Sequence, residues 1–491
     1  MRSNLNNTSM FFKSRRFFLI INIWIILMVV ISLSACKQGP DYKRPNVPIP
    51  STFRGPSLES IHENGVAFGD VFWWDLLQDK VLQDLITMAV IKNHDSRLAA
   101  ERILEAQARL GIARSNQYPQ INGEIDYEVG RGTKVGITPI PSLKSSDFHQ
   151  MTITIGAGYE LDLWGQFSRA TEAAKAQLMA TDEARNIVLM TLVSEVASSY
   201  FTLLELDREL EICKSTLKSR EESYRLVSAR QQGGLATMLD VDQAHGLVLQ
   251  AKTALTQVEL EREQEENYLS QLLGNYPGSI PRGRTLAEQF TGEPLPAGLT
   301  SSLIENRPDI RQAEYNLMAA NAQIGVAKAA YFPRITLTAA GGTISKELSN
   351  LFSGPSLSWS FQPQNTVPIF TASKIKSQIE VTESQQRQAL INYEKTIQNA
   401  FREVSDALLG YEKSRKYRIQ YQELAAVLED QSRLSNLRYV GGVTSYLEVL
   451  DTERQYFEAE IALERARLNE ILYVIKLYKA LGGGWKMQDK N

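Results

Sequence analysis

Residues 151–161 read MTITIGAGYEL, a stretch in which apolar residues alternate with residues that are polar or glycine. One side of an extended chain would carry Met151, Ile153, Ile155, Ala157, Tyr159 and Leu161, and the other side Thr152, Thr154 and Glu160. This period of two predicts a strand whose two faces meet unlike surroundings. About ten such residues, when tilted, also cross a lipid bilayer.

Three further stretches alternate in the same way, at residues 121–129, 335–339 and 357–361. Four strands cannot close a barrel, and an open edge in lipid leaves backbone groups without partners, so we expect neighbouring subunits to close it. Two copies would give about eight strands around a filled interior, whereas three would give about twelve around a water-filled lumen. Four strands of a soluble sandwich remain the alternative.

The N-terminal residues 1–35 have the features of an export signal, because basic residues precede a short apolar run at 17–32. The run ends in LSAC, which is similar to the bacterial lipobox, so Cys36 is predicted to carry a covalent lipid as the first residue of the mature protein. An uncleaved transmembrane anchor is the alternative. Residues 36–75 form a lipid-anchored, proline-spaced arm, and Cys213, in a helical segment, is predicted to be a buried thiol.

Composition excludes several classes of protein. The 491 residues carry a net charge of −3 and no basic block, which argues against nucleic acid as a partner. The four histidines are scattered, and the chain has no HExxH pair, glycine-rich phosphate loop or nucleophile elbow. We therefore expect no enzyme activity, no metal site and no cofactor other than the lipid on Cys36.

The sequence contains an internal repeat. Residues 230–241 (RQQGGLATMLDV) align with residues 438–449 (RYVGGVTSYLEV) at an offset of 208 positions, and Tyr118-Pro119 aligns with Phe332-Pro333 at an offset of 214. This predicts two tandem repeats. They cover residues 76–274 and 301–482, joined by a linker at 275–300 and followed by a tail at 483–491.

Each repeat is predicted to contain a helical segment, two strands and a long helical hairpin. The first has the helical segment 82–115, strands near 120–130 and 148–163, and a hairpin tip near 231–238; the second has 303–330, strands near 334–344 and 356–363, and a tip near 439–446. The first helix of each hairpin, at 167–230 and 373–438, contains no proline. Roughly 65 residues make a helix of roughly 100 Å, longer than a compact core requires, so the hairpins should continue a cylinder away from the membrane.

Several motifs in order resemble the TolC-type outer membrane efflux proteins, of the NodT-type lipoprotein branch that works with resistance-nodulation-division pumps. They are the pattern of residues 438–457, the stretch 305–314 beginning ENRPDI, and IGVA at 324–327 followed by Phe332-Pro333. The resemblance implies a homotrimeric membrane α+β protein, with a twelve-stranded outer-membrane β-barrel continued by a periplasmic twelve-helix α-barrel. It also implies passive conduction from an inner-membrane pump and a periplasmic adaptor to the outside of a Gram-negative bacterium.

The resemblance further implies a periplasmic aperture held by acidic residues near the second tip. Glu448 and Asp451 fall on those positions, three apart and so on one face of a helix. Arg438 and Tyr439 match positions that lock neighbouring helices, and Asp240 is the counterpart of Glu448 in the first repeat. Without the resemblance, these charges could equally be solvated residues at a helix end.

Two further groups of residues are candidates for function. Adaptor docking, implied by the resemblance, would use the tips: Gly233, Gly234 and Leu235 in the first repeat, and Gly441, Gly442 and Val443 in the second. The glycines could alternatively serve only to make the turns. On the polar face of the barrel, Glu124, Asp126 and Glu128 would line the lumen and favour cations.

The sequence leaves two alternatives open. A structural periplasmic lipoprotein with long coiled-coil hairpins and no pore would have the same helical pattern. As an exit duct, the chain could serve drug-like compounds, metal ions or secreted protein; no cluster rich in methionine or histidine favours metal, so drug-like compounds are the default expectation.

Overall fold

The computed structural model describes residues 37–54, 78–131, 147–289 and 300–485. Cys36 and the predicted export signal lie outside these residues. The chain divides into two compact units, a strand unit (residues 1–45, 104–180 and 314–392) and a hairpin unit (residues 46–103, 181–313 and 393–491). The division falls within four helices, and each unit is described by itself.

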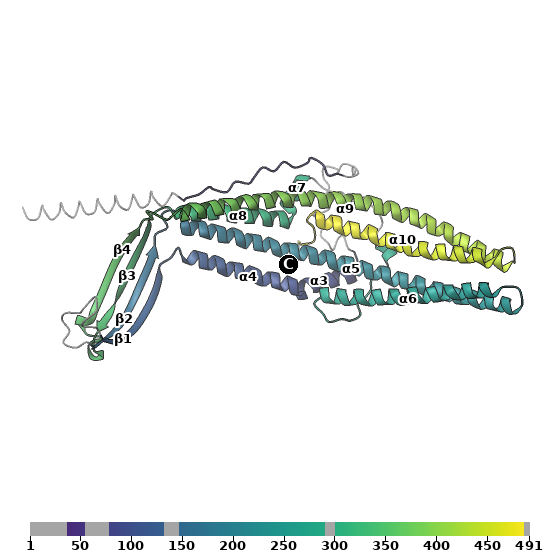
Figure 1. Cartoon of the computed structure of the whole chain (residues 1–491), viewed down its shortest axis with the longest axis horizontal. Coiled ribbons are helices and arrows are strands. Elements are labelled where there is room, and N and C mark those ends of the chain that lie inside the picture. The colour runs from purple at the N-terminus through teal and green to yellow at the C-terminus, as the bar shows by residue number, and fades with distance from the viewer. Residues whose placement is uncertain (1–36, 55–77, 132–146, 290–299, 486–491) are drawn as a thin grey trace, which may run out of the picture. The chain divides into compact units, whose positions relative to one another are not determined.

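Four antiparallel strands form the sheet of the strand unit, in the order β1-β2-β3-β4 (Figure 1). Their bounds are β1 Gln120–Arg131, β2 Asp147–Glu160, β3 Arg334–Ser345 and β4 Leu357–Thr366. Within this chain β1 and β4 are the edge strands. The sheet therefore ends on both sides in a row of backbone groups that no other strand of the described chain pairs.

The register gives this sheet two unlike faces, because residues directly opposite each other on neighbouring strands share a face. One face pairs Ile125 with Ile153, Tyr127 with Met151, Tyr159 with Leu337, and Ala339 with Phe361. The other pairs Glu124 with Thr154, Asp126 with Thr152, and Thr338 with Gln362. The alternation read from residues 151–161 thus extends over the whole sheet.

Helices continue the chain where the strands end. After β2, the Asp162 carboxylate accepts hydrogen bonds from the backbone of Phe167 (3.0 Å) and Ser168 (2.7 Å), which caps the first turn of helix α5 (Gln166–Gln232). Trp164 joins the two strand-to-helix junctions of the chain: its indole nitrogen donates to the Pro333 carbonyl (2.7 Å), and its ring stacks on Phe332 at 4.6 Å.

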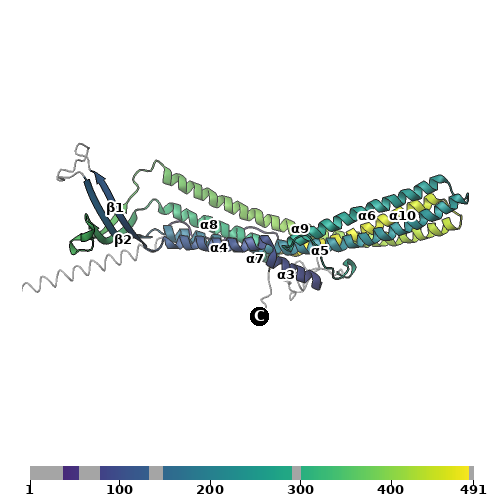
Figure 2. The same cartoon turned by 90° about the horizontal axis from the view of Figure 1, so that it is seen from below.

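Two long helical hairpins dominate the hairpin unit. Helix α5 (Gln166–Gln232) is followed by α6 (Met238–Leu272), and α9 (Lys374–Val440) by α10 (Tyr446–Ala480); Figures 1 and 2 show each shorter helix running back beside the end of the longer one. Among the described helices, α5 alone has a stretch long and apolar enough to cross a membrane, and 67% of that stretch is buried within the protein. Such burial is typical of a core helix.

Apolar clusters hold these helices together. One contains the buried Cys213 with Leu206, Leu210 and Val258, and burial raises the pKa of the Cys213 thiol, as expected for an inert core cysteine. Among the residues that the structure describes, single-turn 3-10 helices lie at Leu286–Glu288, Leu348–Asn350 and Gly354–Ser356.

The helical segments that precede the strands are each two helices rather than the single helix expected from the sequence. The first segment divides into α3 (Lys80–Lys92) and α4 (His94–Ser115), the second into α7 (Thr300–Asn306) and α8 (Pro308–Ala329). At the first break the side chain of Asn93 accepts hydrogen bonds from the backbone of Asp95 (2.8 Å) and Ser96 (3.2 Å), which begins a new helix. At the second break, Pro308 occupies the first helical position, where a backbone N–H would have no partner within the helix, so the lack of an N–H in proline removes no helical hydrogen bond.

The two breaks contact the hairpins in the same way. The Asn93 side chain donates to the carbonyl of Leu272 at the end of α6 (3.0 Å), and Arg307 donates to the carbonyl of Ala480 at the end of α10 (2.8 Å). The next glycines, Gly274 (φ +69°) and Gly482 (φ +87°), lie against the carbonyls of Lys92 and Asn306. Both joints satisfy the last carbonyls of a long helix, which would otherwise lack partners.

Candidate functional sites

The first hairpin tip is a tight turn between α5 and α6. Gly234 adopts φ +74°, and the backbone of Leu235 donates to the Arg230 carbonyl (2.8 Å), which closes the end of α5. The candidate residues Gly233, Gly234 and Leu235 therefore lie together in the turn itself.

The second tip repeats this geometry. Gly442 adopts φ +76°, and the backbone of Val443 donates to the Arg438 carbonyl (2.9 Å). A Cβ atom placed on Gly442 would meet no described atom within 4 Å, so there is room for a side chain to begin and the left-handed backbone is what favours glycine there. Gly441 precedes it, with its N–H bonded to the Leu437 carbonyl (3.0 Å).

Both tips present large apolar side chains to the outside. Leu235 is 77% exposed and Val443 72% exposed, and they are joined by Met238, Leu239, Val440 and Leu447, which are more than half exposed. Clusters of exposed apolar side chains on a small turn are typical of surfaces that bind another protein. Both turns thus expose apolar side chains that are not needed simply to reverse the direction of the chain.

The candidate aperture residues Arg438 and Glu448 form an ion pair across the second tip. The guanidinium of Arg438 lies 3.0 Å from the Glu448 carboxylate, and Thr444 donates a second hydrogen bond to that carboxylate. Both charged side chains remain partly exposed, 55% for Arg438 and 36% for Glu448. This pair joins the ends of α9 and α10 within one chain.

The other two candidate acids have different surroundings. Asp451 accepts a hydrogen bond from Gln455 (2.6 Å), lies 3.4 Å from Arg454, and is 53% exposed. Asp240 accepts from the backbone and hydroxyl of Thr237 (both 2.8 Å), while Thr237 accepts from the Asp240 backbone, a capping box at the start of α6. Asp451 is thus the more accessible carboxylate, whereas Asp240 stabilises the start of helix α6 through the capping box.

Tyr439 is buried rather than exposed at the aperture, with only 9% of its surface accessible. Its ring lies 5.3 Å from that of Tyr446, in an apolar cluster that also contains Val227, Val241 and Val449 from both hairpins. Burial also raises the pKa of the Tyr446 hydroxyl. Tyr439 therefore connects the two hairpins by packing.

Arg230 is a tip residue to which the sequence pattern assigned no role. Its guanidinium donates to the Tyr439 carbonyl (2.9 Å) and lies over the Tyr439 ring at 4.6 Å, which ties the end of α5 to the end of α9. A signal was present in the sequence, because Arg230 is the counterpart of Arg438 in the aligned repeats.

The three candidate lumen acids lie side by side on the polar face of the sheet. Glu124, Asp126 and Glu128 oppose Thr154, Thr152 and Gln150 of β2 in register. The register thus brings all three carboxylates to one face, opposite the face that carries Ile125 and Tyr127.

The N-terminal arm binds to specific residues of the strand unit. The sequence did not predict these contacts. Arg169 is 3% exposed and donates to the carbonyls of Gln38 (3.1 Å) and Gly39 (3.3 Å) and to the Asp41 carboxylate (2.7 Å). A side chain on Gly39 would come within 2.5 Å of the backbone of Gly325. The residues that follow Cys36 are therefore held firmly at the start of α5.

Among the described residues, no group of three His, Cys, Asp or Glu side chains is arranged to hold a metal ion. Cys36 lies outside the described residues, so its predicted lipidation stays a prediction.

Comparison with protein families gives one match, to the family described as outer membrane efflux protein, over residues 85–275 and 299–483. Among characterised relatives, the cation efflux system protein CusC of Escherichia coli O6:H1 is 35% identical over 464 residues, 93% of this chain and 98% of the relative. The toluene efflux pump outer membrane protein TtgC of Pseudomonas putida is 35% identical over 461 residues, 93% and 94% of the two chains.

Solved structures agree with these matches. A crystal structure of CusC superposes with a TM-score of 0.82 at 34% identity, covering 91% of this chain and all of that one. The open state of the MtrE outer membrane channel of Neisseria gonorrhoeae superposes with a TM-score of 0.81 at 33% identity, covering 92% and 99%. The resemblance inferred from the sequence motifs is thereby confirmed.

Proposed function

The chain belongs to the outer membrane efflux protein family, and we propose that three copies of it form one conduit through the outer membrane and the periplasm. It is accordingly an outer membrane transport protein of a Gram-negative bacterium and not an enzyme. The observation that carries the proposal is the two-faced sheet with two unpaired edges.

The edges β1 and β4 are the argument for a trimer. Lipid offers no hydrogen-bond partners, so both edges must pair with neighbouring copies before the sheet can lie in a bilayer. Three copies of a four-stranded sheet make a barrel of about twelve strands, wide enough for water inside. The apolar face then meets lipid, and Glu124, Asp126 and Glu128 line the lumen.

The hairpins would continue the conduit as an α-barrel of about twelve helices, built from two tandem repeats in each chain. Equal helix lengths support the repeats, since α5 and α9 each have 67 residues, and α6 and α10 each have 35. The matching joints at Asn93 and Arg307 support them as well, because these residues are 214 positions apart while their partners Leu272 and Ala480 are 208 apart.

Two parts of the chain support the partners that we propose. The exposed apolar tips around Leu235 and Val443 would receive a periplasmic adaptor, which connects the conduit to an inner-membrane resistance-nodulation-division pump. In the strand unit, a lipid on Cys36 would hold the docked arm at the outer membrane. In this scheme the conduit itself is passive, and the inner-membrane pump supplies the driving force for export.

Drug-like organic compounds are our first proposal for the cargo, and metal cations the second. The relatives divide in the same way, because proteins named for cation efflux and for toluene efflux are both 35% identical to this chain. Cells that carry the protein with its own pump and adaptor would be compared for growth in a panel of organic drugs and of transition-metal salts. Tolerance that rises only for the metal salts would reverse the order.

The conduit itself is tested by conductance. Purified protein in a planar bilayer should give small, flickering currents, and Asp451→Ala should increase them, because three exposed carboxylates at a constriction would hold cations there and so obstruct it, and alanine removes this obstruction. A well-folded trimer that conducts in neither form would instead support the structural lipoprotein without a pore.

A further inference from the structure

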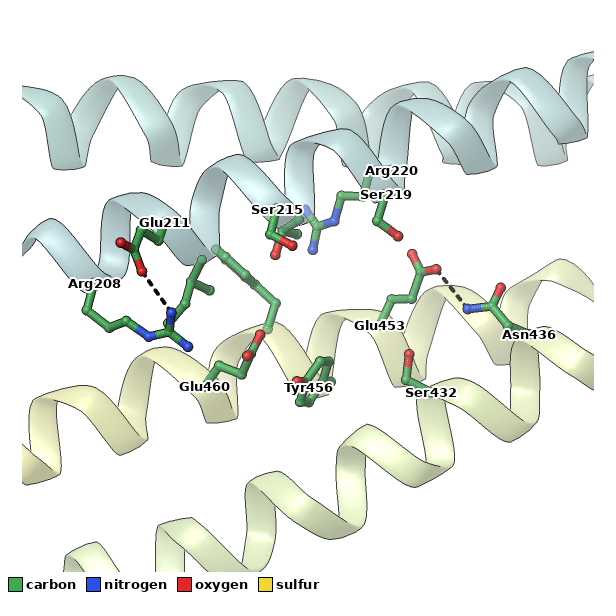
Figure 3. A pocket seen from close by; sticks show the side chains of 13 residues that line it. Arg208, Glu211, Ser215, Ser219, Arg220, Ser432, Asn436, Glu453, Tyr456 and Glu460 are labelled. Carbon is green, nitrogen blue, oxygen red and sulfur yellow. Dashed lines mark hydrogen bonds and ion pairs between the residues drawn. The ribbon is translucent and has the colours of Figure 1, made fainter. Parts of the chain in front are cut away.

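A polar cavity of about 290 Å³ lies within the hairpin unit, between α5, α9 and α10 (Figure 3). Its size is at the small end of the range for ligand pockets. It is separate from the tips, the sheet and the docked arm, and the transport proposal makes no use of it.

Two charged side chains face this cavity, the buried Arg220 and the half-buried Glu453, and each keeps one buried atom without a hydrogen-bond partner among the described residues. Arg220 is 3% exposed; it donates to the Leu247 carbonyl (3.1 Å) and lies over the Phe457 ring at 5.1 Å, but its Nε has no partner. Glu453 accepts from Asn436 (3.2 Å) through Oε1, whereas its buried Oε2 has none. Buried polar atoms are rarely left unpaired, so each calls for a ligand or ordered water.

The charges around the cavity favour a cation. Burial raises the pKa of Glu453, and burial raises the pKa of Glu460, two turns further along α10, although Tyr456 hydrogen-bonds to the Glu460 carboxylate. Arg208, the cation nearest Glu460, already pairs with Glu211 (2.8 Å). When its three glutamates are ionised, the lining carries one net negative charge against Arg208 and Arg220, and a bound cation would favour that ionised state over the neutral one that burial favours.

The arrangement excludes one metal ion held jointly by Glu453 and Glu460, because seven residues of helix separate them by roughly 10 Å. The remaining lining is rich in hydroxyl groups, from Ser215, Thr216, Ser219 and Ser432, with the rings of Tyr456 and Phe457 as apolar walls. Hydroxyl groups beside aromatic walls suit a ligand that itself has hydroxyls on a carbon skeleton.

We propose that this cavity binds a small hydroxylated organic cation, of the class of amino sugars. The ligand ammonium donates to the free Oε2 of Glu453, and a ligand hydroxyl accepts from the free Nε of Arg220. The bound cation cancels the net negative charge of the lining, and the serine and threonine hydroxyls bond the remaining polar groups.

The test is isothermal titration calorimetry at pH 7 on the full-length assembled protein in detergent. The two ligands are glucosamine and N-acetylglucosamine, which has the same sugar ring but no positively charged ammonium group. Glucosamine should bind with millimolar affinity, and N-acetylglucosamine at least about ten-fold more weakly, because one charge-assisted hydrogen bond is lost. Glu453→Gln should weaken glucosamine binding by a similar factor. Glu458→Gln, an exposed acid of the same helix, is the matched control and should not change it.

Equal binding of the two sugars would overturn the proposal, and so would the absence of glucosamine binding to the wild-type protein. Unchanged glucosamine affinity in Glu453→Gln would also overturn it. The comparison of the two sugars on the unaltered protein does not depend on how any variant folds. None of these readouts involves conductance or export, so the cavity and the conduit can fail independently.

Discussion

Glu205 and Glu209 lie one turn apart on α5, and both side chains are buried, with 4% and 0% of the residue exposed. Arg465 donates to Glu209 (2.7 Å), whereas one carboxyl oxygen of Glu205 has no hydrogen-bond partner among the described residues. Burial, together with the hydrogen bond and the charge of Glu209, raises the pKa of Glu205 to about 9. At neutral pH, Glu205 therefore keeps its proton and shares it with Glu209.

This pair predicts how stability changes with pH. Because the pKa of Glu205 is higher in the folded protein than the ordinary 4.5, its contribution is fully present below about pH 4.5 and is lost as the pH rises through about 9. Glu205→Gln cannot ionise and can still donate to Glu209. The variant should be more stable than wild type at pH 8, by on the order of 1 to 3 kcal/mol, and should flatten the fall between pH 5 and 9.

Thermal unfolding followed by circular dichroism at pH 5, 7 and 9 measures this effect. Glu222→Gln, an exposed acid on the same helix, serves as the control and should follow wild type. Parallel curves for wild type and Glu205→Gln would mean that the carboxyl pair does not titrate in this range.

Single residues are where the sequence predicted least. The pattern identified Arg438, Glu448 and Asp451 as charges near the second tip, but it could not show that Arg230 contacts Tyr439, 209 residues away. It also gave no sign of the buried Glu205, because a carboxylate inside a helical repeat looks the same in sequence as one on the surface. Such features depend on packing between distant helices.

At the scale of elements, the hairpin tips carry the next prediction. Gly442→Trp should leave assembly intact and abolish export, because a bulky group on the exposed turn blocks an approaching hairpin, whereas a Cβ atom at this position meets no described atom of its own chain within 4 Å. The left-handed backbone itself costs a non-glycine residue about 1 to 2 kcal/mol. Export is measured as drug tolerance of cells that carry the pump and the adaptor.

Gly442→Asn separates bulk from backbone strain, because asparagine tolerates the left-handed conformation and is much smaller than tryptophan. We expect this variant to retain most of the export activity. Full drug tolerance in cells with Gly442→Trp would show that the tip does not dock a partner.

Strand β1 makes a prediction about ion selectivity. Neutralising Glu124, Asp126 and Glu128 together, as Gln, Asn and Gln, should reduce the cation preference of reconstituted channels at least about two-fold, because the row of charges on the polar face is removed. Reversal potentials in a salt gradient report the preference. Neutralising three exposed acids of helix α4 instead (Asp95, Glu101 and Glu105) should leave it unchanged; a wild-type channel that prefers anions would contradict the assignment.

Elements could be predicted from the sequence far better than contacts. Strand β1 was expected at 120–130 and spans Gln120–Arg131, and the first helix of the first hairpin was expected at 167–230 and α5 spans Gln166–Gln232, because hydrophobic period and glycine turns are local signals. The breaks at Asn93 and Arg307 were missed. Both are stabilised by hydrogen bonds to the ends of α6 and α10, more than 170 residues away, which local patterns do not contain.

At the scale of the whole molecule, assembly decides whether the sheet can exist in a membrane. The described residues supply four strands and two open edges, so the barrel that we propose needs several chains, whereas one chain alone determines which residues lie on each face of the sheet. The alternation that predicted the strands therefore also implies that neighbouring residues on one strand differ sharply in which substitutions they tolerate.

Ile125 and Asp126 test this directly, because they are adjacent on β1 and point to opposite faces. Ile125→Lys adds a charge to the lipid face, at about 2 to 4 kcal/mol in each copy near the bilayer centre, and three copies multiply the cost. Asp126→Lys adds the same side chain to the water-filled lumen. We expect the first variant to lose the heat-resistant trimer and its membrane insertion, and the second to retain both with altered ion selectivity.

Outer membrane fractionation and gel mobility with and without heating measure insertion and trimer formation for the two variants. Equal tolerance of lysine at both positions would mean that the two faces meet the same surroundings, as in a soluble sandwich. The reverse result, with Asp126→Lys alone disrupting assembly, would put the acidic row against a neighbouring surface instead of water. Only a closed barrel with lipid outside and water inside predicts failure at Ile125 and tolerance one residue later.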